Sequence, residues 1–208
     1  VSLAFTNTIS LFSPNVTGEP LLGNNPMGIG IPAADPEQSV VLDIAMTQAS
    51  VGKVAMAAMR GDRAPADWGL TKHGAPTDDP AKILDSGSFL AMGGHKGSGL
   101  SFMIDLLTAG LAGGLLCFEQ GERGRPSDSA GGSTKTFIAI RPFGDHLGGR
   151  VDAFKRCMQA DAPGAQWPGE GSYTRRQDYL ANGIELLPQI VEAVEGVSAE
   201  LDIPITWR

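Results

Sequence analysis

Glycine and proline interrupt this chain along its whole length, and this pattern constrains the fold more than any other feature of the sequence. The 208 residues include 28 glycines and 14 prolines, which are spread out rather than gathered in a linker. Because both residue types break regular structure, the chain is expected to fold from many short elements. No clean domain boundary is visible, so we assign residues 1–208 to one fold.

Apolar runs alternate with helical patterns between these breaks. Residues 40–45 and 136–140 are nearly continuous apolar runs, a pattern typical of central strands that are covered on both faces. Residues 1–6 form a further β-type run, and the small polar residues of 121–133 indicate an exposed loop. Helices are predicted at 48–60, closed by Gly61, and at 98–111, 150–161, 174–181 and 188–201. Strands that alternate with helices predict an α/β fold.

Charge and cysteine content exclude several classes of protein. The 16 basic and 23 acidic residues give a net charge of -7, which opposes binding to the phosphates of nucleic acids. The longest apolar helix candidate, 100–116, is interrupted by Asp105 and by glycines, so we expect no membrane span. Cys117 and Cys157 form no CxxC pair, which favours a reducing compartment, by default the cytoplasm.

Common catalytic and nucleotide motifs are missing from the sequence. The segments Gly28-Ile29-Gly30 and Gly97-Ser98-Gly99 lack the third glycine of the Rossmann fingerprint. The GxxxxGK[ST] phosphate loop and the GxSxG nucleophile turn do not occur. The three histidines are far apart and have no metal-ligand spacing, so we expect no metal site.

A glycine-rich segment before the 98–111 helix is the best candidate for anion binding. Residues 93–99 read Gly-Gly-His-Lys-Gly-Ser-Gly. Glycines let backbone amides approach an anion, a helix N-terminus adds partial positive charge, and Lys96 adds a full charge. The alternative is a plain turn in which Lys96 is solvated and Ser98 caps the helix. The residues alone leave both interpretations open.

Charged residues at three further places in the sequence have a functional or a structural interpretation. Asp43 follows an apolar strand at a place where an acid can hold a ribose hydroxyl, or it caps the next helix. Asp105, inside an apolar helix, needs a buried partner and is interpreted as structural. The turn 168–171 opens a helix with Arg175 and Arg176 in its first turns, and these arginines suit a phosphate or a solvated helix face.

Several of these blocks, in order, resemble the malate/L-lactate dehydrogenase family of non-Rossmann NAD(P)-dependent oxidoreductases. This family also contains ureidoglycolate dehydrogenase, 2,3-diketogulonate reductase, sulfolactate dehydrogenase and the piperideine-2-carboxylate reductases. The resemblance extends over essentially the whole chain. It rests on Leu-Leu-Gly-Asn-Asn-Pro at 21–26, Leu-Asp-Ile-Ala at 42–45, Gly-Lys-Val at 52–54, Gly-Ala-Pro-Thr-Asp-Asp-Pro at 74–80, Gly-Gly-His-Lys-Gly at 93–97 and Pro-Gly-Glu at 168–170.

The resemblance implies a fold, a cofactor and a set of site residues. The fold is a central mixed sheet flanked by helices in a homodimer that binds NAD or NADP. The residues implied in cofactor binding are Thr8, Asp43, Ile44, Ala45, His95, Lys96, Gly169, Glu170, Gly171 and Arg175. Asn24 takes the position of a substrate-side threonine in many relatives. An acid at residue 43 facing the ribose favours NAD, whereas an arginine at residue 175 suits the 2′-phosphate of NADP.

The resemblance also implies what this chain does not hold. Relatives carry a catalytic histidine, a serine and a substrate-binding arginine upstream of the residue numbered Val1 here, so we assign no catalytic residue and expect an N-terminal piece of the fold elsewhere. The implied reaction is hydride transfer between nicotinamide and a small 2-keto or 2-hydroxy acid. The alternatives are a cyclic ketimine, 2,3-diketogulonate, or a non-catalytic domain that binds nucleotides or a subunit.

Overall fold

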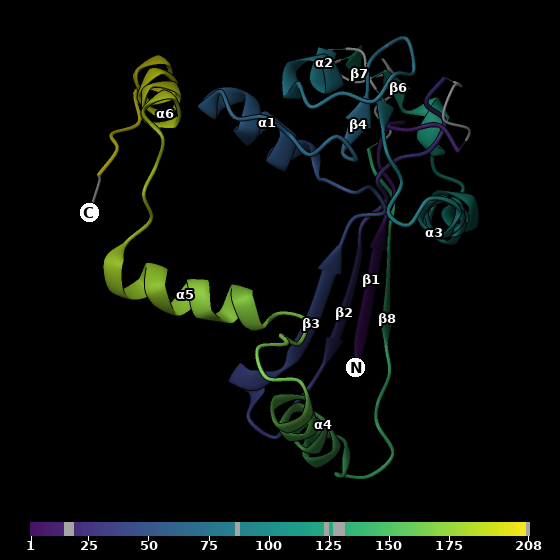
Figure 1. The fold of residues 1–208 in the computed structure, drawn as a ribbon, viewed down its shortest axis with the longest axis vertical. Coiled ribbons are helices and arrows are strands. Elements are labelled where there is room, and N and C mark those ends of the chain that lie inside the picture. Colours follow the sequence, from purple (N-terminus) through teal and green to yellow (C-terminus); the bar gives the residue numbers. More distant parts are fainter. Residues whose placement is uncertain (15–18, 86–87, 123–124, 127–131, 207–208) are drawn as a thin grey trace. The chain divides into compact units, whose positions relative to one another are not determined.

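The structure, a computed structural model, describes residues 1–14, 19–85, 88–122, 125–126 and 132–206. The chain forms two compact units, Val1–Gly169 and Glu170–Arg208, and each is described by itself. Figure 1 shows the ribbon, coloured from the N-terminus to the C-terminus. The assignment of residues 1–208 to one fold stays a prediction.

A four-stranded sheet organises the first unit. Its strands are β1 (Ser2–Thr6), β2 (Met27–Ile31), β3 (Val40–Ile44) and β8 (Lys135–Ala139), in the order β3-β2-β1-β8. Leu3 of β1 lies opposite Ile29 on one side and Ile138 on the other. The predicted α/β class and central sheet are confirmed. The sheet is not mixed, however, because each pair of its described strands is antiparallel.

The prediction that 40–45 and 136–140 are central strands is wrong. They form β3 and β8, the two edges of the sheet, and side chains on both strands are exposed, with Val41 at 48% and Phe137 at 74%. The central places belong to β1, which lies in the predicted β-type run 1–6, and to β2, in which two glycines interrupt the apolar residues. Gly30, for example, sits against Ser2, where a Cβ would come within 2.7 Å of the serine Oγ.

Short strands complete the β-structure of the first unit. β4 (Gly69–Leu70) pairs with β5 (Ser88–Phe89), and β6 (Gly121–Glu122) pairs with β7 (Arg125–Pro126). The last pair corrects the prediction of a plain loop over 121–133, although much of that stretch lies outside the described residues. None of these two-residue strands has enough length to show a period in the sequence.

The helices of the first unit keep most of the predicted positions. The elements are η1 (Pro36–Gln38), α1 (Val51–Arg60), α2 (Pro80–Asp85), α3 (His95–Asp105), a π-helical segment η2 (Leu106–Gly110), η3 (Cys117–Glu119) and α4 (Leu147–Asp161). Ser50 caps α1 by accepting a hydrogen bond from the Lys53 amide at 3.2 Å. Gly61 ends α1 at φ 72°, as predicted from its position.

The second unit contains two helices, α5 (Glu170–Asn182) and α6 (Pro188–Leu201). α6 has the predicted bounds and begins with a proline, whose missing N–H costs nothing at a helix start. α5 begins four residues earlier than predicted. Among the described residues of the chain, no helix is both long and apolar enough to cross a membrane.

The main apolar core lies beyond one end of the four-stranded sheet, beneath α1 and α2. Its buried members are Leu11, Phe12, Leu22, Ala49, Val54, Ala64, Ile83 and Phe89. Phe12 pairs with Leu22 in an isolated β-bridge, which brings the loop after β1 and the segment before β2 into the same core. This packing anchors both segments near the end of the sheet.

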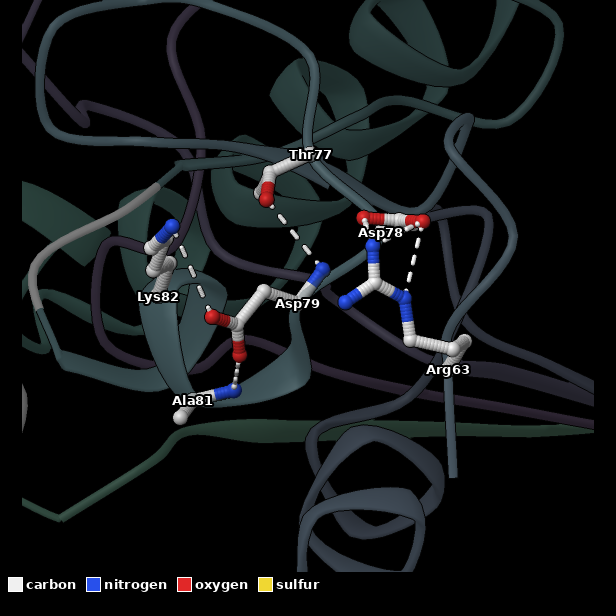
Figure 2. A network of polar contacts seen from close by, with 6 residues as sticks. All are labelled: Arg63, Thr77, Asp78, Asp79, Ala81 and Lys82. Atoms are coloured by element: carbon white, nitrogen blue, oxygen red, sulfur yellow. Dashed lines mark hydrogen bonds and ion pairs between the residues drawn. The ribbon is translucent and has the colours of Figure 1, made fainter. Parts of the chain in front are cut away.

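Figure 2 shows an ion-pair network that joins the two ends of the segment between α1 and α2. The Arg63 Nε donates to Asp78 Oδ2 at 2.9 Å, and Nη2 donates to both Asp78 oxygens at 2.6 Å. Next to it, Lys82 Nζ lies 3.6 Å from Asp79 Oδ2, and Asp79 accepts a hydrogen bond from the Ala81 amide. The hydrogen bond from Arg63 is the main cause that lowers the pKa of Asp78 below 3.8.

Replacing Arg63 with glutamine is expected to raise the pKa of Asp78 towards 3.8, because the hydrogen-bonded positive charge is lost. A carboxyl group whose pKa is lowered by folding stabilises the fold above its unfolded pKa, and that contribution disappears as the pH falls through the folded value. An NMR titration of the Asp78 carboxyl carbon measures the change. The exposed neighbour Arg60→Gln is the control, and an equal change in both variants would contradict the assignment to Arg63.

Candidate functional site

Loops from three strands meet at one end of the four-stranded sheet. Thr8 follows β1, Asn24 precedes β2, and Met46 follows β3. Because these strands pair antiparallel, the three positions lie at the same end of the sheet. Thr8 Oγ1 donates a hydrogen bond to Asn24 Oδ1 at 2.9 Å, and the Met46 amide donates to the Asn24 carbonyl at 2.7 Å. Three segments that are distant in the sequence are therefore joined by direct hydrogen bonds.

The start of α3 lies against the same loops. The Met92 amide donates to the Met46 carbonyl at 2.9 Å, and Thr47 pairs with Ala91 in an isolated bridge. The structure therefore brings the Asp43-Ile44-Ala45 end of β3 together with the turn that carries His95 and Lys96. Figure 1 shows α3 beside the end of the sheet at which β1 finishes.

Glycines shape the turn before α3. Gly93 and Gly94 have φ values of 60° and 62°, which glycine adopts without the steric cost that a side chain would bring. Gly97 packs so closely that an added Cβ would overlap the Met92 carbonyl oxygen and lie 2.9 Å from that of Met46. The turn thus holds the first residues of α3 directly against the segment after β3.

The backbone amides of this turn are less available than the sequence indicates. The Lys96 amide donates to the Gly93 carbonyl at 3.4 Å, and the Gly97 amide donates to the Met92 carbonyl at 2.9 Å. The expected row of unpaired amides is therefore partly satisfied within the turn. The exposed side chain of Lys96, at the positive end of the helix, is the main charge offered to an anion.

The structure excludes both capping alternatives. Ser98 lies inside α3, which begins at His95, and its hydroxyl donates to the Gly94 carbonyl at 3.2 Å rather than capping the helix. Asp43 does not cap α1, because that role belongs to Ser50. Asp43 is exposed near the end of β3, opposite Gly28. Since the sheet is antiparallel, the rule that places ligands at the carboxyl ends of parallel strands does not apply to it.

Gly169 lies beside β3, two residues along from Asp43. The Val41 amide donates to the Pro168 carbonyl at 3.1 Å, and Gly169 has φ 94° with no room for a Cβ next to the Val41 backbone. The first unit thus contains eight of the proposed site residues. They are Thr8, Asn24, Asp43, Ile44, Ala45, His95, Lys96 and Gly169.

The remaining proposed residues belong to the second unit. Glu170 and Gly171 form the first turn of α5, and Arg175 follows one turn later. Arg175 Nη2 donates to Ser172 Oγ at 3.1 Å. Arg175 also lines a hollow of about 350 Å³ together with Tyr179 and other residues of this unit. The surface of this hollow is mainly apolar, and Leu180 and Ile184 also line it.

A buried polar network lies next to the site, and of its members only Asp105 was predicted from the sequence to be a buried structural residue. Asp105, interpreted as structural, accepts hydrogen bonds from Asn7 Nδ2 at 2.9 Å and from the Cys117 amide at 3.1 Å. Asn25 donates to the Ser101 carbonyl at 2.9 Å. Burial raises the pKa of the Cys117 thiol to about 11. The network ties α3 to the loops that hold Thr8 and Asn24.

Asn25 and Asn7 were missed because asparagine is read as a turn residue in a sequence. Asn25 is fully buried and has φ 27°, a region that asparagine enters more readily than most residues. Its position inside the Gly-Asn-Asn-Pro block was the only available signal. That block therefore contains one partly exposed asparagine at residue 24 and one buried asparagine at residue 25.

Comparison with known proteins gives consistent matches. A family model described as malate/L-lactate dehydrogenase matches residues 1–195. The Delta(1)-pyrroline-2-carboxylate/Delta(1)-piperideine-2-carboxylate reductase of Pseudomonas syringae pv. tomato is 35% identical over 198 residues, which cover 94% of this chain and 57% of that protein. A malate/(S)-sulfolactate dehydrogenase of Methanothermus fervidus is 33% identical over 214 residues, which cover 100% of this chain and 61% of that protein.

Solved structures give the same result. The crystal structure of delta1-piperideine-2-carboxylate reductase from Pseudomonas syringae pv. tomato superposes with a TM-score of 0.77 at 32% identity, over 94% of this chain and 59% of that chain. A dehydrogenase from Sinorhizobium meliloti gives 0.81 at 28% identity, over 94% and 58%. The chain spans less than two thirds of each of these proteins. With the motif order, the sheet and the family match in agreement, the chain belongs to the malate/L-lactate dehydrogenase family.

Proposed function

We propose that this chain forms the cofactor-binding part of an NAD(P)-dependent oxidoreductase. The observation that carries the proposal is the meeting of the Thr8, Asn24 and Met46 loops with the N-terminal turn of α3. A (2R)-3-sulfolactate dehydrogenase (NADP(+)) of Chromohalobacter salexigens, 30% identical over 92% of this chain, supports a nicotinamide cofactor. NAD and NADP both remain within the proposal.

The described residues fit such a cofactor. Lys96 offers an exposed positive charge at a helix N-terminus, which suits a phosphate. Asp43, Ile44 and Ala45 lie close to this turn, and an exposed carboxylate at Asp43 suits a ribose hydroxyl. Gly169, Glu170, Gly171 and Arg175 are proposed as a further contact segment, in which the arginine would recognise a 2′-phosphate.

The proposed substrate is a small acid with an oxidisable or reducible carbon beside its carboxylate. The main candidate is a 2-keto or 2-hydroxy acid of the malate or lactate type. The second candidate is a cyclic ketimine, and the 35% identity to a pyrroline- and piperideine-2-carboxylate reductase favours it. Asn24 is proposed to contact the substrate, since its side chain is partly exposed at the same end of the sheet as Lys96.

The chemistry divides between the cofactor, this chain and the rest of the protein. A bound nicotinamide would supply or accept the hydride. The residues of this chain bind and orient both reactants, which lowers the entropic part of the barrier. By resemblance to the family, the proton donor and the arginine that holds the substrate carboxylate are not among residues 1–208, so no catalytic residue of this chain is proposed.

Lys96→Ala is expected to weaken NAD(P)H binding by the full-length protein about tenfold, because it removes a charge-assisted contact to phosphate. The exposed Lys72→Ala is the matched control and is expected to bind the cofactor as the parent protein does. Fluorescence titration of NADH and NADPH measures both dissociation constants. Equal constants in the two variants would contradict the proposed role of Lys96.

An assay of the full-length protein tests the reaction itself. Oxidation of NADH or NADPH is followed with pyruvate, oxaloacetate, 2,3-diketogulonate and piperideine-2-carboxylate. Turnover with one of these acids supports the enzyme and identifies its substrate class. Cofactor binding without turnover on any of them would instead favour the non-catalytic nucleotide-binding domain.

The proposal includes a homodimer in the cytoplasm. Apolar side chains of α3 and η2 are exposed in the chain, among them Phe102 at 53% and Met103 at 51%, and contiguous apolar surface of this kind favours an interface. Light scattering of the full-length protein measures the oligomeric state.

The proposed compartment rests on the two cysteines. Cys117 and Cys157 are both free thiols, which suits a reducing compartment.

A further inference from the structure

The hydrogen bond between Thr8 and Asn24 fixes which end of the Asn24 carboxamide faces outward. Thr8 Oγ1 donates to Asn24 Oδ1 at 2.9 Å, and its next acceptor, the Ile9 carbonyl, is more distant at 3.3 Å. A hydroxyl has one proton to donate. With Oδ1 taken by Thr8, the carboxamide turns its two Nδ2 donors away from the threonine.

Further hydrogen bonds and close packing hold Thr8 and Asn24 in place. The Thr8 amide donates to Asn25 Oδ1 at 3.0 Å, and the Asn24 carbonyl accepts from the Met46 amide. At Gly23 an added Cβ would overlap Thr8 Oγ1. Asn25 is itself held by two hydrogen bonds from Nδ2 to Ser101, one to its carbonyl and one to its hydroxyl. Thr8 and Asn24 therefore have little freedom to change partners.

The Nδ2 group of Asn24 has no hydrogen-bond partner among the described residues. The side chain is only partly buried, so its donors are open to a ligand at the end of the sheet where Lys96 also lies. An N–H donor pair matches an acceptor such as a carboxylate or carbonyl oxygen, and it mismatches a group that can only donate.

We infer that Thr8 is a positioning residue that orients Asn24 as a donor to an anionic or carbonyl oxygen of the substrate. This inference rests on the proposed function and changes the role of Thr8, which the family resemblance assigns to cofactor binding. The hydroxyl of Thr8 is engaged with Asn24, so its effect is exerted on the substrate through the carboxamide. The substrate group at this position is accordingly an acceptor.

The test compares Thr8→Val with Thr8→Ser in the full-length protein. Valine keeps the shape of threonine and removes the hydroxyl, whereas serine keeps the hydroxyl. At saturating NAD(P)H, Thr8→Val is expected to raise the KM for the best acid substrate about tenfold, because Asn24 loses its orientation. The dissociation constant of NAD(P)H, measured by fluorescence, is expected to stay within about twofold. Thr8→Ser is expected to recover most of the lost kcat/KM.

A double-mutant cycle with Asn24→Ala completes the test. If Thr8 acts through Asn24, Thr8→Val has little further effect on kcat/KM once Asn24 is alanine. Independent effects of the two changes, equal losses in the valine and serine variants, or a loss of cofactor affinity as large as the rise in KM would each overturn the inference. An active parent protein with an unaffected Thr8→Val variant overturns the inference alone. A parent protein without turnover on any acid overturns the proposed function and the inference together.

Discussion

Gly97→Ala is expected to destabilise the full-length protein by about 3 kcal/mol or more, since the new methyl group has no space. Its Cβ would overlap the Met92 carbonyl oxygen and lie 2.9 Å from the Met46 carbonyl oxygen. Backbone atoms cannot rotate away as a flexible side chain can, so α3 must move from the segment after β3. Cofactor affinity is expected to fall with stability, because this movement displaces Lys96.

Gly99→Ala is the matched control for this prediction. Gly99 lies two residues further along α3, and a Cβ there meets nothing within 4 Å. Alanine at an exposed helical position is expected to stabilise the protein by up to about 1 kcal/mol. Urea unfolding of both variants measures the two effects, which have opposite signs. A Gly97→Ala protein as stable as its parent would show that the turn does not need this close approach.

Asp105→Ala is expected to cost about 3 kcal/mol of unfolding free energy, because a buried acceptor is lost. Asp105 is 5% exposed, and it accepts from Asn7 Nδ2 and from the Cys117 amide. After the change the Cys117 amide has no acceptor from this side chain, and a buried unpaired donor is costly. Asn7 keeps its second hydrogen bond, to the Leu115 carbonyl at 2.8 Å, which limits the loss.

Asp105→Asn separates the loss of the acceptor from the loss of volume. Asn7 and the Cys117 amide donate to different oxygens of Asp105. An asparagine keeps the size of the side chain but replaces one of these oxygens with an NH₂ group, so it can accept from only one of the two donors in this arrangement. We expect about half the cost of the alanine variant in urea unfolding. Asp62→Ala, at an exposed position, serves as the control with a change within about 0.5 kcal/mol. Equal stability of Asp105→Ala and Asp62→Ala would contradict a structural role for Asp105.

Local signals in the sequence predicted the local elements well. The bounds of α6 follow from a proline at its start and a regular apolar pattern, and Gly61 marks the end of α1 because glycine accepts a left-handed conformation. These features depend on residues close together in the chain. The same holds for Asp105, since an acid within an apolar helix needs a partner wherever that partner comes from.

The order of the strands and the state of the turn amides could not be predicted in the same way. A hydropathy run shows that a strand has two apolar faces, and it does not show which strands flank it, so β3 and β8 were placed in the centre instead of at the edges. The α3 turn looked like a row of free amides. Only the fold shows that the Gly97 amide already has the Met92 carbonyl as its acceptor.

The contact between Pro168 and Val41 has a consequence for self-association. β3 is an edge strand, and an open edge offers backbone donors to any strand of another molecule. The Pro168 carbonyl occupies the Val41 donor, and proline has no N–H with which a further strand could be continued. The segment 167–169 therefore covers part of the outer edge of β3, and this contact reduces the number of donors that β3 offers to a strand of another molecule.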